Sequence, residues 1–380
     1  MRRARRLLGA ALVGAALALA APAAAAPILA LQDDNLPNVP PGPALTRSLD
    51  RLAATGTRVT RLDVLWKLVA PRRPANPKDP ADPAYDWSRY DAILRGLRER
   101  GISVIVDFYQ TPPWATRTGK GEDNEAPRAA DGAAFAAALA RRYNGVSTDA
   151  AGRPLPKVNR IEVWNEPNFG TFWLPQCHQT AKGIRLDSPR AYAALLAASY
   201  REIKRANPDA IVIGGVAGPG GDTPKACPKT GDVSVGTTDF ALDLARQRPP
   251  LDAWSQHIYP IGSPLEAPFF PSWGTIPRLQ RAVDKLKRGI PIYVTETGYH
   301  TSYNRYHRYW VSEDQQAAYL DQTVQIAARY PRVKIAVWFN LQDNSFWTGG
   351  LLRADGSRKP AYARFVALAE AGQTPLDWSP

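Results

Sequence analysis

Short apolar segments alternate with amphipathic segments along most of the chain. Eight of the apolar segments are typical of buried strands: residues 28–32, 58–66, 102–109, 160–166, 210–216, 251–259, 291–298 and 334–340. Eight helical patterns follow them in turn: residues 46–56, 88–101, 131–145, 188–208, 238–248, 276–289, 313–331 and 359–372. Eight strands, each followed by a helix, predict an α/β fold, a (β/α)8 TIM barrel, that forms a single domain over residues 27–380.

An open, doubly wound sheet is the other architecture that this alternation allows. Such a sheet normally has a Gly-rich turn after its first strand, and residues 31–42 (LQDDNLPNVPPG) contain no GxGxxG. Long segments, residues 167–187, 217–237 and 260–274, follow the fourth, fifth and sixth predicted strands. In a barrel they lie at the carboxyl ends of the strands, where active sites are built, so we expect them to form the walls of a groove.

Residues 1–26 have a composition of their own. They contain four Arg near the start, an Ala/Leu-rich stretch and small residues before Ala26. This pattern predicts a secretory signal peptide, and an uncleaved N-terminal anchor is the alternative. No other long apolar run follows, so we expect a secreted, extracellular protein that is not attached to a membrane after cleavage.

The charge of the chain is basic, and its composition is that of a globular protein. The formal net charge is +13, and without the four Arg of residues 1–26 the remaining 44 Lys and Arg exceed the 35 acidic residues by nine. Such a surplus suits nucleic acid, an acidic polymer or only a soluble surface. Because no basic run clusters after residue 26, we expect no nucleic-acid partner. Hydrophobic residues make up 44% of the chain, enough for a sizeable core.

The chain has two Cys residues, Cys177 and Cys227. Export permits a disulfide, although two buried free thiols are the alternative. The two residues fall in the loops after the fourth and fifth strands, which are neighbours in a barrel, so a disulfide would link two adjacent walls of the groove. No Cys and His spacing indicates a metal site, and we expect neither a metal nor a cofactor.

Two carboxylates stand at corresponding strand ends. Glu166 in IEVWNEPN ends the fourth strand, and Glu296 in YVTETGY ends the seventh. Asn, acidic residues and Pro also form ordinary turns, but strand-end placement in a barrel favours a catalytic interpretation. Glycoside hydrolysis uses such a pair, with one carboxyl to protonate the leaving oxygen and one carboxylate on the other side of the scissile bond.

At these strand ends the sequence resembles a known group of enzymes. WNEPN after strand four, QHIYP at strand six, TETGY at strand seven and VWFNLQD at strand eight are similar to motifs of the clan A glycoside hydrolases. Those enzymes are retaining (β/α)8 barrels, and the TPPWA after strand three resembles their family 39-like and family 5-like, cellulase-like members. The resemblance spans about residues 27–372.

The resemblance implies roles for particular residues. Glu166 matches the general acid/base of the clan and Glu296 matches the nucleophile. The other residues that it implies, all as contacts to the substrate or to the nucleophile, are Asn165 toward the sugar 2-hydroxyl, His257 and Tyr259 beside the nucleophile, Trp338 beneath the cleaved sugar and Arg61 against the nucleophile. Trp114, after strand three, is a further candidate because aromatic faces pack against pyranose rings.

These roles are chemically consistent, and three of the residues have simpler explanations. Pro167 should favour an extended backbone at Glu166. Arg61 could instead pair with Asp63 or a helix end, His257 could be an ordinary strand-end residue, and Trp338 could pack in the core. Family 5-like members often have a His at the end of strand three, where this chain has Asp107, Tyr109 and Gln110. We expect Asp107 to pair with an Arg.

The combined prediction is an exported, monomeric, metal-independent O-glycosyl hydrolase that cleaves a β-linked polysaccharide or oligosaccharide by double displacement. Two alternatives stay open: a non-catalytic carbohydrate-binding barrel, and a basic surface protein that binds acidic polymers. The retaining mechanism predicts carboxyl groups about 5–5.5 Å apart, against about 6.5–9.5 Å in an inverting pair. The sugar and the linkage are not encoded in these motifs, and the net charge only mildly favours an acidic polymer.

Overall fold

The computed structural model describes residues 27–119, 121–220, 223, 225–227, 233–265, 271–304 and 309–372. The predicted signal peptide, residues 1–26, lies outside these residues. Eight parallel strands form one sheet: β1 (Ile28–Gln32), β2 (Val59–Leu65), β3 (Ser103–Tyr109), β4 (Arg160–Val163), β7 (Ile211–Ala217), β8 (Ala253–Ile258), β9 (Ile292–Thr297) and β10 (Val333–Phe339). Their order is β1-β10-β9-β8-β7-β4-β3-β2, and β1 also contacts β2. The sheet therefore curls into a nearly closed barrel, as predicted.

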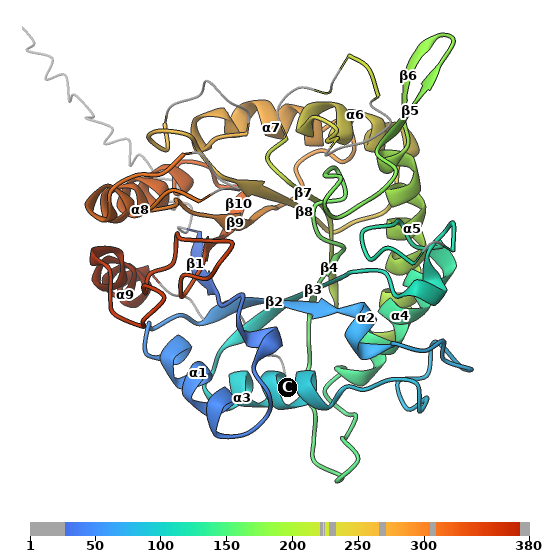
Figure 1. Cartoon of the computed structure of the whole chain (residues 1–380), viewed down its shortest axis with the longest axis horizontal. Coiled ribbons are helices and arrows are strands. Elements are labelled where there is room, and N and C mark those ends of the chain that lie inside the picture. The colour runs from blue at the N-terminus through green and yellow to red at the C-terminus, as the bar shows by residue number, and fades with distance from the viewer. Residues whose placement is uncertain are drawn as a thin grey trace, which may run out of the picture.

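A ring of helices surrounds these strands (Figure 1). It consists of α1 (Pro43–Ala53), α3 (Ser88–Glu99), α4 (Ala129–Arg142), α5 (Ser188–Ala206), α6 (Thr237–Gln247), α7 (Ile276–Val283), α8 (Glu313–Ala327) and α9 (Pro360–Gly372). A short helix, α2 (Trp66–Val69), and three 3-10 turns, η1 (Leu36–Asn38), η2 (Pro113–Ala115) and η3 (Trp273–Thr275), lie in the connections. Each of the eight predicted helices is therefore confirmed. Among the described residues, none of the helices is long and apolar enough to cross a membrane.

A small hairpin was not expected from the sequence. Within the loop after β4, β5 (Cys177–Thr180) pairs antiparallel with β6 (Gly183–Leu186), and the hairpin projects from the rim of the barrel (Figure 1). Most of its side chains are exposed or half-buried, so it has no apolar face for a strand pattern to reveal.

The inside of the barrel has an apolar layer and a polar layer. Successive side chains of a strand point to opposite faces, so alternate residues enter the interior. The buried apolar layer comprises Ala30, Val59, Ile105, Ile213, Ala253, Tyr293, Ile335 and Val337. Two residues farther along their strands, Gln32, Arg61 and Asp107 have the same parity and are at most 1% exposed. The apolar layer thus supports a buried polar layer toward the carboxyl ends of the strands.

Candidate active site

The structure brings six of the predicted site residues together at the carboxyl end of the barrel. Glu296 lies in β9, His257 in β8 and Arg61 in the middle of β2, while Tyr259 follows β8 directly. Asn165 and Glu166 follow β4, which ends at Val163, three residues earlier than predicted. The interactions below connect all six residues into one network.

Glu296 is held through both of its oxygens. Arg61 Nη1 donates to Oε1 at 2.8 Å, and the Tyr259 hydroxyl donates to Oε2 at 2.5 Å. His257 Nδ1 lies 3.4 Å from the same Oε2. Burial raises the pKa of Glu296 above its ordinary value, although His257 and Arg61 act in the opposite direction. Fixed orientation on both oxygens suits a nucleophile, which must point one oxygen at a reacting carbon.

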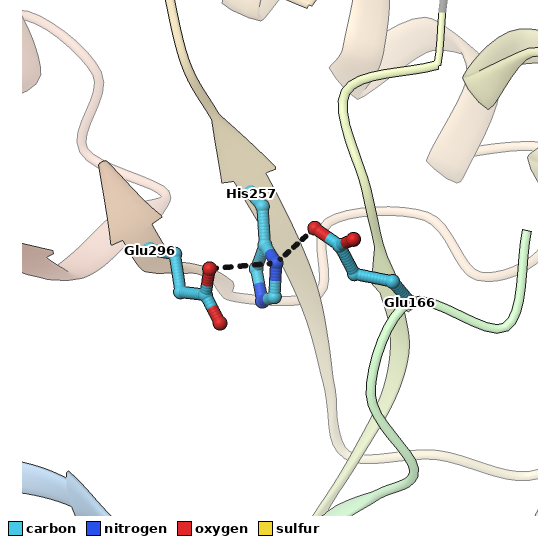
Figure 2. Close-up of side chains that lie close together, drawn as sticks. All are labelled: Glu166, His257 and Glu296. Carbon is cyan, nitrogen blue, oxygen red and sulfur yellow. Dashed lines mark hydrogen bonds and ion pairs between the residues drawn. The ribbon is translucent and has the colours of Figure 1, made fainter. Parts of the chain in front are cut away.

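His257 lies between the two carboxylates, as Figure 2 shows. Its Nδ1 is 2.7 Å from Oε1 of Glu166, and the ring is fully buried. Burial alone would lower the pKa of His257, but the charge of Glu296 and the hydrogen bond and charge of Glu166 outweigh it and raise that pKa above 6.5. One oxygen of each carboxylate and a ring nitrogen of His257 all lie within 4.8 Å of one another. The three groups therefore form one compact cluster.

Arg61 is the buried centre of this network. It is 1% exposed, and its Nη2 donates to Oδ1 of Asn165 at 2.9 Å. Asp107 lies 3.1 Å from Nη2 and Asp63 3.1 Å from Nη1. Arg61 thus pairs with Asp63, as the simpler explanation proposed, and with Glu296 at the same time. Burial raises the pKa of Asp107 well above its ordinary value, although Arg61 opposes the shift.

Glu162 is a further member of the network that the strand-end motifs did not indicate. It lies in β4, is fully buried, and accepts a hydrogen bond from Arg61 Nε at 2.7 Å. The sequence does indicate its position. Arg160 and Glu162 alternate with the apolar Ile161 and Val163, so the two charged residues share the interior face of the strand. A carboxylate at an interior position of a barrel strand needs a buried partner.

The backbone at Glu166 differs from the expectation based on Pro167. The φ angle of Glu166 is 40°, in the left-handed region rather than the extended one, so that expectation was wrong. The Glu166 N–H donates to the Val216 carbonyl at 2.9 Å, and this tertiary bond outweighs the local bias of the following Pro. A Cβ on Gly218 would lie 2.8 Å from the Glu166 carboxyl carbon, so only Gly leaves room for this carboxylate.

Two predicted substrate contacts lie away from the network. Trp338 is fully buried and belongs to the core outside the barrel, with its ring centroid 6.3 Å from that of Tyr299. Trp114 donates from its indole to the Ala70 carbonyl at 2.7 Å and packs edge-on against Trp66. Neither Trp makes a described contact with Glu166 or Glu296. For Trp338, core packing is therefore the interpretation that the structure supports.

Phe339, the next residue, lies on the interior face of β10. It shares the interior parity of Ile335 and Val337, is half-buried, and its ring lies 6.4 Å from that of Tyr259. Trp347 packs beside it at 5.2 Å. Because alternate residues of a strand point inward, the apolar Ile335 and Val337 would have placed Phe339, rather than Trp338, on the interior face.

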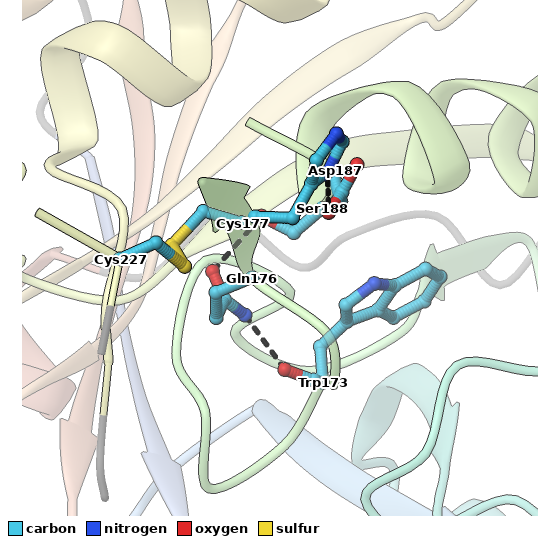
Figure 3. The surroundings of a disulfide bond; sticks show 7 residues. Trp173, Gln176, Cys177, Asp187, Ser188 and Cys227 are labelled. Atoms are coloured by element: carbon cyan, nitrogen blue, oxygen red, sulfur yellow. Dashed lines mark hydrogen bonds and ion pairs between the residues drawn. A yellow bond between two sulfur atoms is a disulfide. The ribbon is translucent and has the colours of Figure 1, made fainter. Parts of the chain in front are cut away.

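The two Cys form a disulfide. Cys177 and Cys227 are joined, with their Cα atoms 5.9 Å apart, and in Figure 3 the bond lies beside the turn that contains Gln176. Gln176 fixes this turn, because its Nε2 donates to the Trp173 carbonyl at 2.7 Å and its Oε1 accepts from the Ser188 hydroxyl at 2.9 Å. Since β4 pairs with β7, the disulfide links two adjacent walls, as predicted.

Within the described residues, Glu166, His257 and Glu296 are the one grouping whose donor atoms could surround a metal ion. Two carboxylates and an imidazole are suitable ligands for a transition metal. However, a cation bound by all three would displace the hydrogen bond between His257 and Glu166 and would occupy the space between the carboxylates. The arrangement fits acid and base chemistry at the same atoms at least as well.

Comparisons with known proteins agree on the fold. A family 39 glycoside hydrolase from the gut symbiont Bacteroides cellulosilyticus WH2 is 20% identical with a TM-score of 0.57, covering 91% of this chain and 64% of that one. A GH39 β-xylosidase from Caulobacter crescentus is 19% identical with a TM-score of 0.59, covering 92% and 73%. A GH5_18 protein from Streptomyces cattleya, solved with GlcNAc, is 17% identical with a TM-score of 0.62, covering 92% and 82%.

The chain is a (β/α)8 barrel of the same kind. It spans less than two thirds of the length of the first of these proteins. No family model and no curated protein matches the sequence. The similarity is thus one of fold, and it agrees with the resemblance of the strand-end motifs to family 39-like and family 5-like glycoside hydrolases.

Proposed function

We propose that this chain is a retaining glycoside hydrolase, with Glu296 as nucleophile and Glu166 as general acid/base. The observation that carries the proposal is the placement of the two carboxylates on either side of His257, with the nearest oxygens within 4.8 Å. This short separation supports a retaining mechanism, because an inverting pair stands about 6.5–9.5 Å apart to admit a water molecule. The matched structures support the choice of reaction, since they include a β-xylosidase and a glucosidase.

In the first step, a Glu296 oxygen attacks the anomeric carbon of the sugar. The bond between that carbon and the glycosidic oxygen breaks, and the leaving oxygen takes a proton from Glu166. His257 hydrogen-bonds Glu166 and so holds this proton within the pair until it is transferred. The products of the step are the released alcohol and a glycosyl ester on Glu296.

In the second step, water replaces Glu296 at the anomeric carbon. The Glu166 carboxylate takes a proton from the water, and the ester bond to Glu296 breaks to regenerate the free carboxylate. The inverted centre of the first step is inverted again, so the product keeps the β-configuration. Proton and charge balance are restored for the next cycle.

The surrounding residues support these steps without taking part in bond formation. Arg61 and Tyr259 donate to Glu296, which favours its ionised form. Because Oδ1 of Asn165 is bound by Arg61, its Nδ2 is the group available to donate to the sugar 2-hydroxyl. Phe339 and Tyr259 supply aromatic surface beside the nucleophile.

We further propose that the enzyme is exported as a monomer and acts without a metal on a β-linked polysaccharide or oligosaccharide. The signal-like composition of residues 1–26 and the Cys177–Cys227 disulfide support export. A matched β-xylosidase from Caulobacter crescentus is described as monomeric, which supports the proposed monomer.

Covalent trapping tests this function. The protein is incubated with activated 2-deoxy-2-fluoro-β-glycosides of several sugars, digested with trypsin and examined by mass spectrometry. We expect one fluoro-sugar on the tryptic peptide of residues 289–305, in which Glu296 is the one acidic residue. The Glu296→Gln variant should take up no label. Labelling of that variant, or none of the wild type with any sugar of the series, would exclude the proposed nucleophile and favour a non-catalytic barrel.

The Glu166→Ala variant tests the acid/base separately. Loss of general acid and base catalysis should slow turnover by about 10²- to 10⁴-fold. An activated leaving group needs little protonation, so this variant should still be labelled at Glu296, and added azide should restore turnover by forming a β-glycosyl azide. An α-configured azide would contradict double displacement. Turnover lost on addition of a chelator would contradict the metal-independent mechanism.

A further inference from the structure

A pocket of about 370 Å³ lies near the proposed nucleophile. It is formed at the carboxyl ends of β1, β2 and β3 and by the loop after β10, and its lining includes Asp34, Asp63, Tyr109, Gln110, Asn344 and Phe346. Asp63 accepts a hydrogen bond at 3.1 Å from Arg61 Nη1, the atom that also binds Glu296 at 2.8 Å. One side chain therefore separates the pocket from the nucleophile, and its volume is in the range of small-ligand sites.

The charge of the pocket is negative and poorly compensated. No Lys or Arg of the described part of the chain lies within 4 Å of the Asp34 carboxylate, and its nearest donor is Asn344 Nδ2 at 3.4 Å. Among the described residues, the one basic partner of Asp63 is Arg61, which also pairs with Asp107, Glu162 and Glu296. Four carboxylates thus share one guanidinium, and Asp34 adds a fifth acidic group.

The pKa of Asp34 is raised in this acidic and buried environment. Burial and the charges of Asp63 and Glu296 raise the pKa of Asp34 to about 7, although Arg61 opposes the shift. A neutral or anionic ligand would leave that repulsion in place. A cation beside Asp34 and Asp63 would relieve it, since an opposite charge at short range favours the ionised carboxylate.

Polar and aromatic side chains complete the wall of the pocket. Gln110 lines it with a half-buried side chain. At the edge of the pocket, the Phe346 side chain is 64% exposed and offers an apolar face of the kind on which sugar rings pack.

We propose that this pocket is a subsite for an amino sugar, in which Asp34 and Asp63 bind the ammonium group and Phe346 packs against the ring. The inference rests on the proposed glycosidase function and names its substrate class: a β-linked glycan with free amino groups. It also reverses the preference that the net charge suggested, because the pocket disfavours uronic acids although the chain as a whole is basic.

Binding measurements that need no turnover test the proposal. Three β-1,4-linked trisaccharides, of glucosamine, of glucose and of N-acetylglucosamine, are titrated calorimetrically into the full-length Glu166→Gln variant, which keeps Glu296 and every pocket residue. We expect the glucosamine trisaccharide to bind about 10- to 100-fold more tightly than the other two, as for hydrogen bonds to a charged group. Its affinity alone should fall as ionic strength rises.

A second substitution assigns the preference to the pocket. Asp34→Asn in the same background should remove most of the preference for glucosamine over glucose. Asp50→Asn, which removes an exposed carboxylate on α1, is the matched control and should keep the preference. Equal affinities for glucosamine and glucose, an unaltered preference in Asp34→Asn, or competition by calcium chloride for glucosamine would overturn the amino-sugar assignment. Fluoro-sugar trapping is independent of these results, so either proposal can fail alone.

Discussion

Glu296 and Glu166 are the same residue type at the same end of the barrel, but their surroundings differ. Arg61, Tyr259 and His257 contact Glu296 and engage both of its oxygens. In the described part of the chain, Glu166 has one such partner, His257, which contacts only Oε1. A carboxylate held on both oxygens is pre-oriented to attack, whereas one with a free oxygen is able to exchange a proton with a ligand. The difference in contacts therefore accounts for the difference in proposed role.

Among the substitutions considered, that of Arg61 should have the largest effect on the reactivity of Glu296. Arg61→Lys keeps the positive charge but loses the planar fork that binds Glu296 and Asn165 at once. We expect the rate of labelling by the fluoro-glycoside to fall by about 10²- to 10³-fold, as when one preorganised donor is lost from an active site. The acidic limb of the pH–rate profile should move little, because Lys keeps the positive charge through which Arg61 lowers the pKa of Glu296.

Arg100→Lys is the matched control for that experiment. Arg100 lies next to α3 and pairs with the exposed Asp50, so its replacement should leave labelling unchanged. Melting temperatures of both variants would show whether each is folded. Labelling of folded Arg61→Lys within twofold of the wild-type rate would contradict the orienting role of Arg61.

Removal of the Tyr259 hydroxyl should have a smaller effect on the same carboxylate. In Tyr259→Phe the 2.5 Å hydrogen bond to Glu296 is lost while the ring stays against Trp347. A hydrogen bond to a charged group predicts a loss of about 10- to 100-fold in kcat/KM. Labelling and turnover should fall together, because both need Glu296. Tyr303→Phe, at an exposed position, is the control, and a Tyr259 variant as active as this control would exclude the role.

The smallest expected effect concerns His257, which joins the two carboxylates. Its pKa is raised in the folded protein, so its stabilising contribution is complete below pH 6.5 and is lost as pH rises through the folded value. His257→Asn should therefore reduce the free energy of unfolding by about 1 kcal/mol in acid and by less in alkali. Urea unfolding of both proteins at pH 5.5 and pH 9 would measure this. If the difference in free energy of unfolding between the two proteins were larger at pH 9 than at pH 5.5, His257 would not be the positively charged group that we assign.

The sequence predicted the barrel well because its elements have clear periods and boundaries. The helix of residues 188–208 begins and ends within two residues of α5, Ser188–Ala206, where Pro189 and Pro208 bracket the pattern. The β5–β6 hairpin was missed because its side chains are mostly exposed and polar, so burial imposes no period on it.

The site was predicted in part, and the errors have physical causes. Strand-end motifs pointed to Glu166 and Glu296, which the structure brings together, but the choice of Trp338 over Phe339 ignored the alternation that decides which side chain enters the barrel. The backbone of Glu166 was mispredicted because a hydrogen bond from another strand determines it. Asp34 was missed because its environment depends on Asp63 and Glu296, which are close only in the folded chain.

The disulfide also determines how the chain responds to a protease. The bond between Cys177 and Cys227 closes a ring of the chain that contains the hairpin, α5 and β7. A single cut at the projecting hairpin would therefore leave both pieces covalently attached, and no strand of the barrel would be free to diffuse away. In an environment rich in proteases, the projecting hairpin can be nicked while the two walls beside Glu166 stay joined.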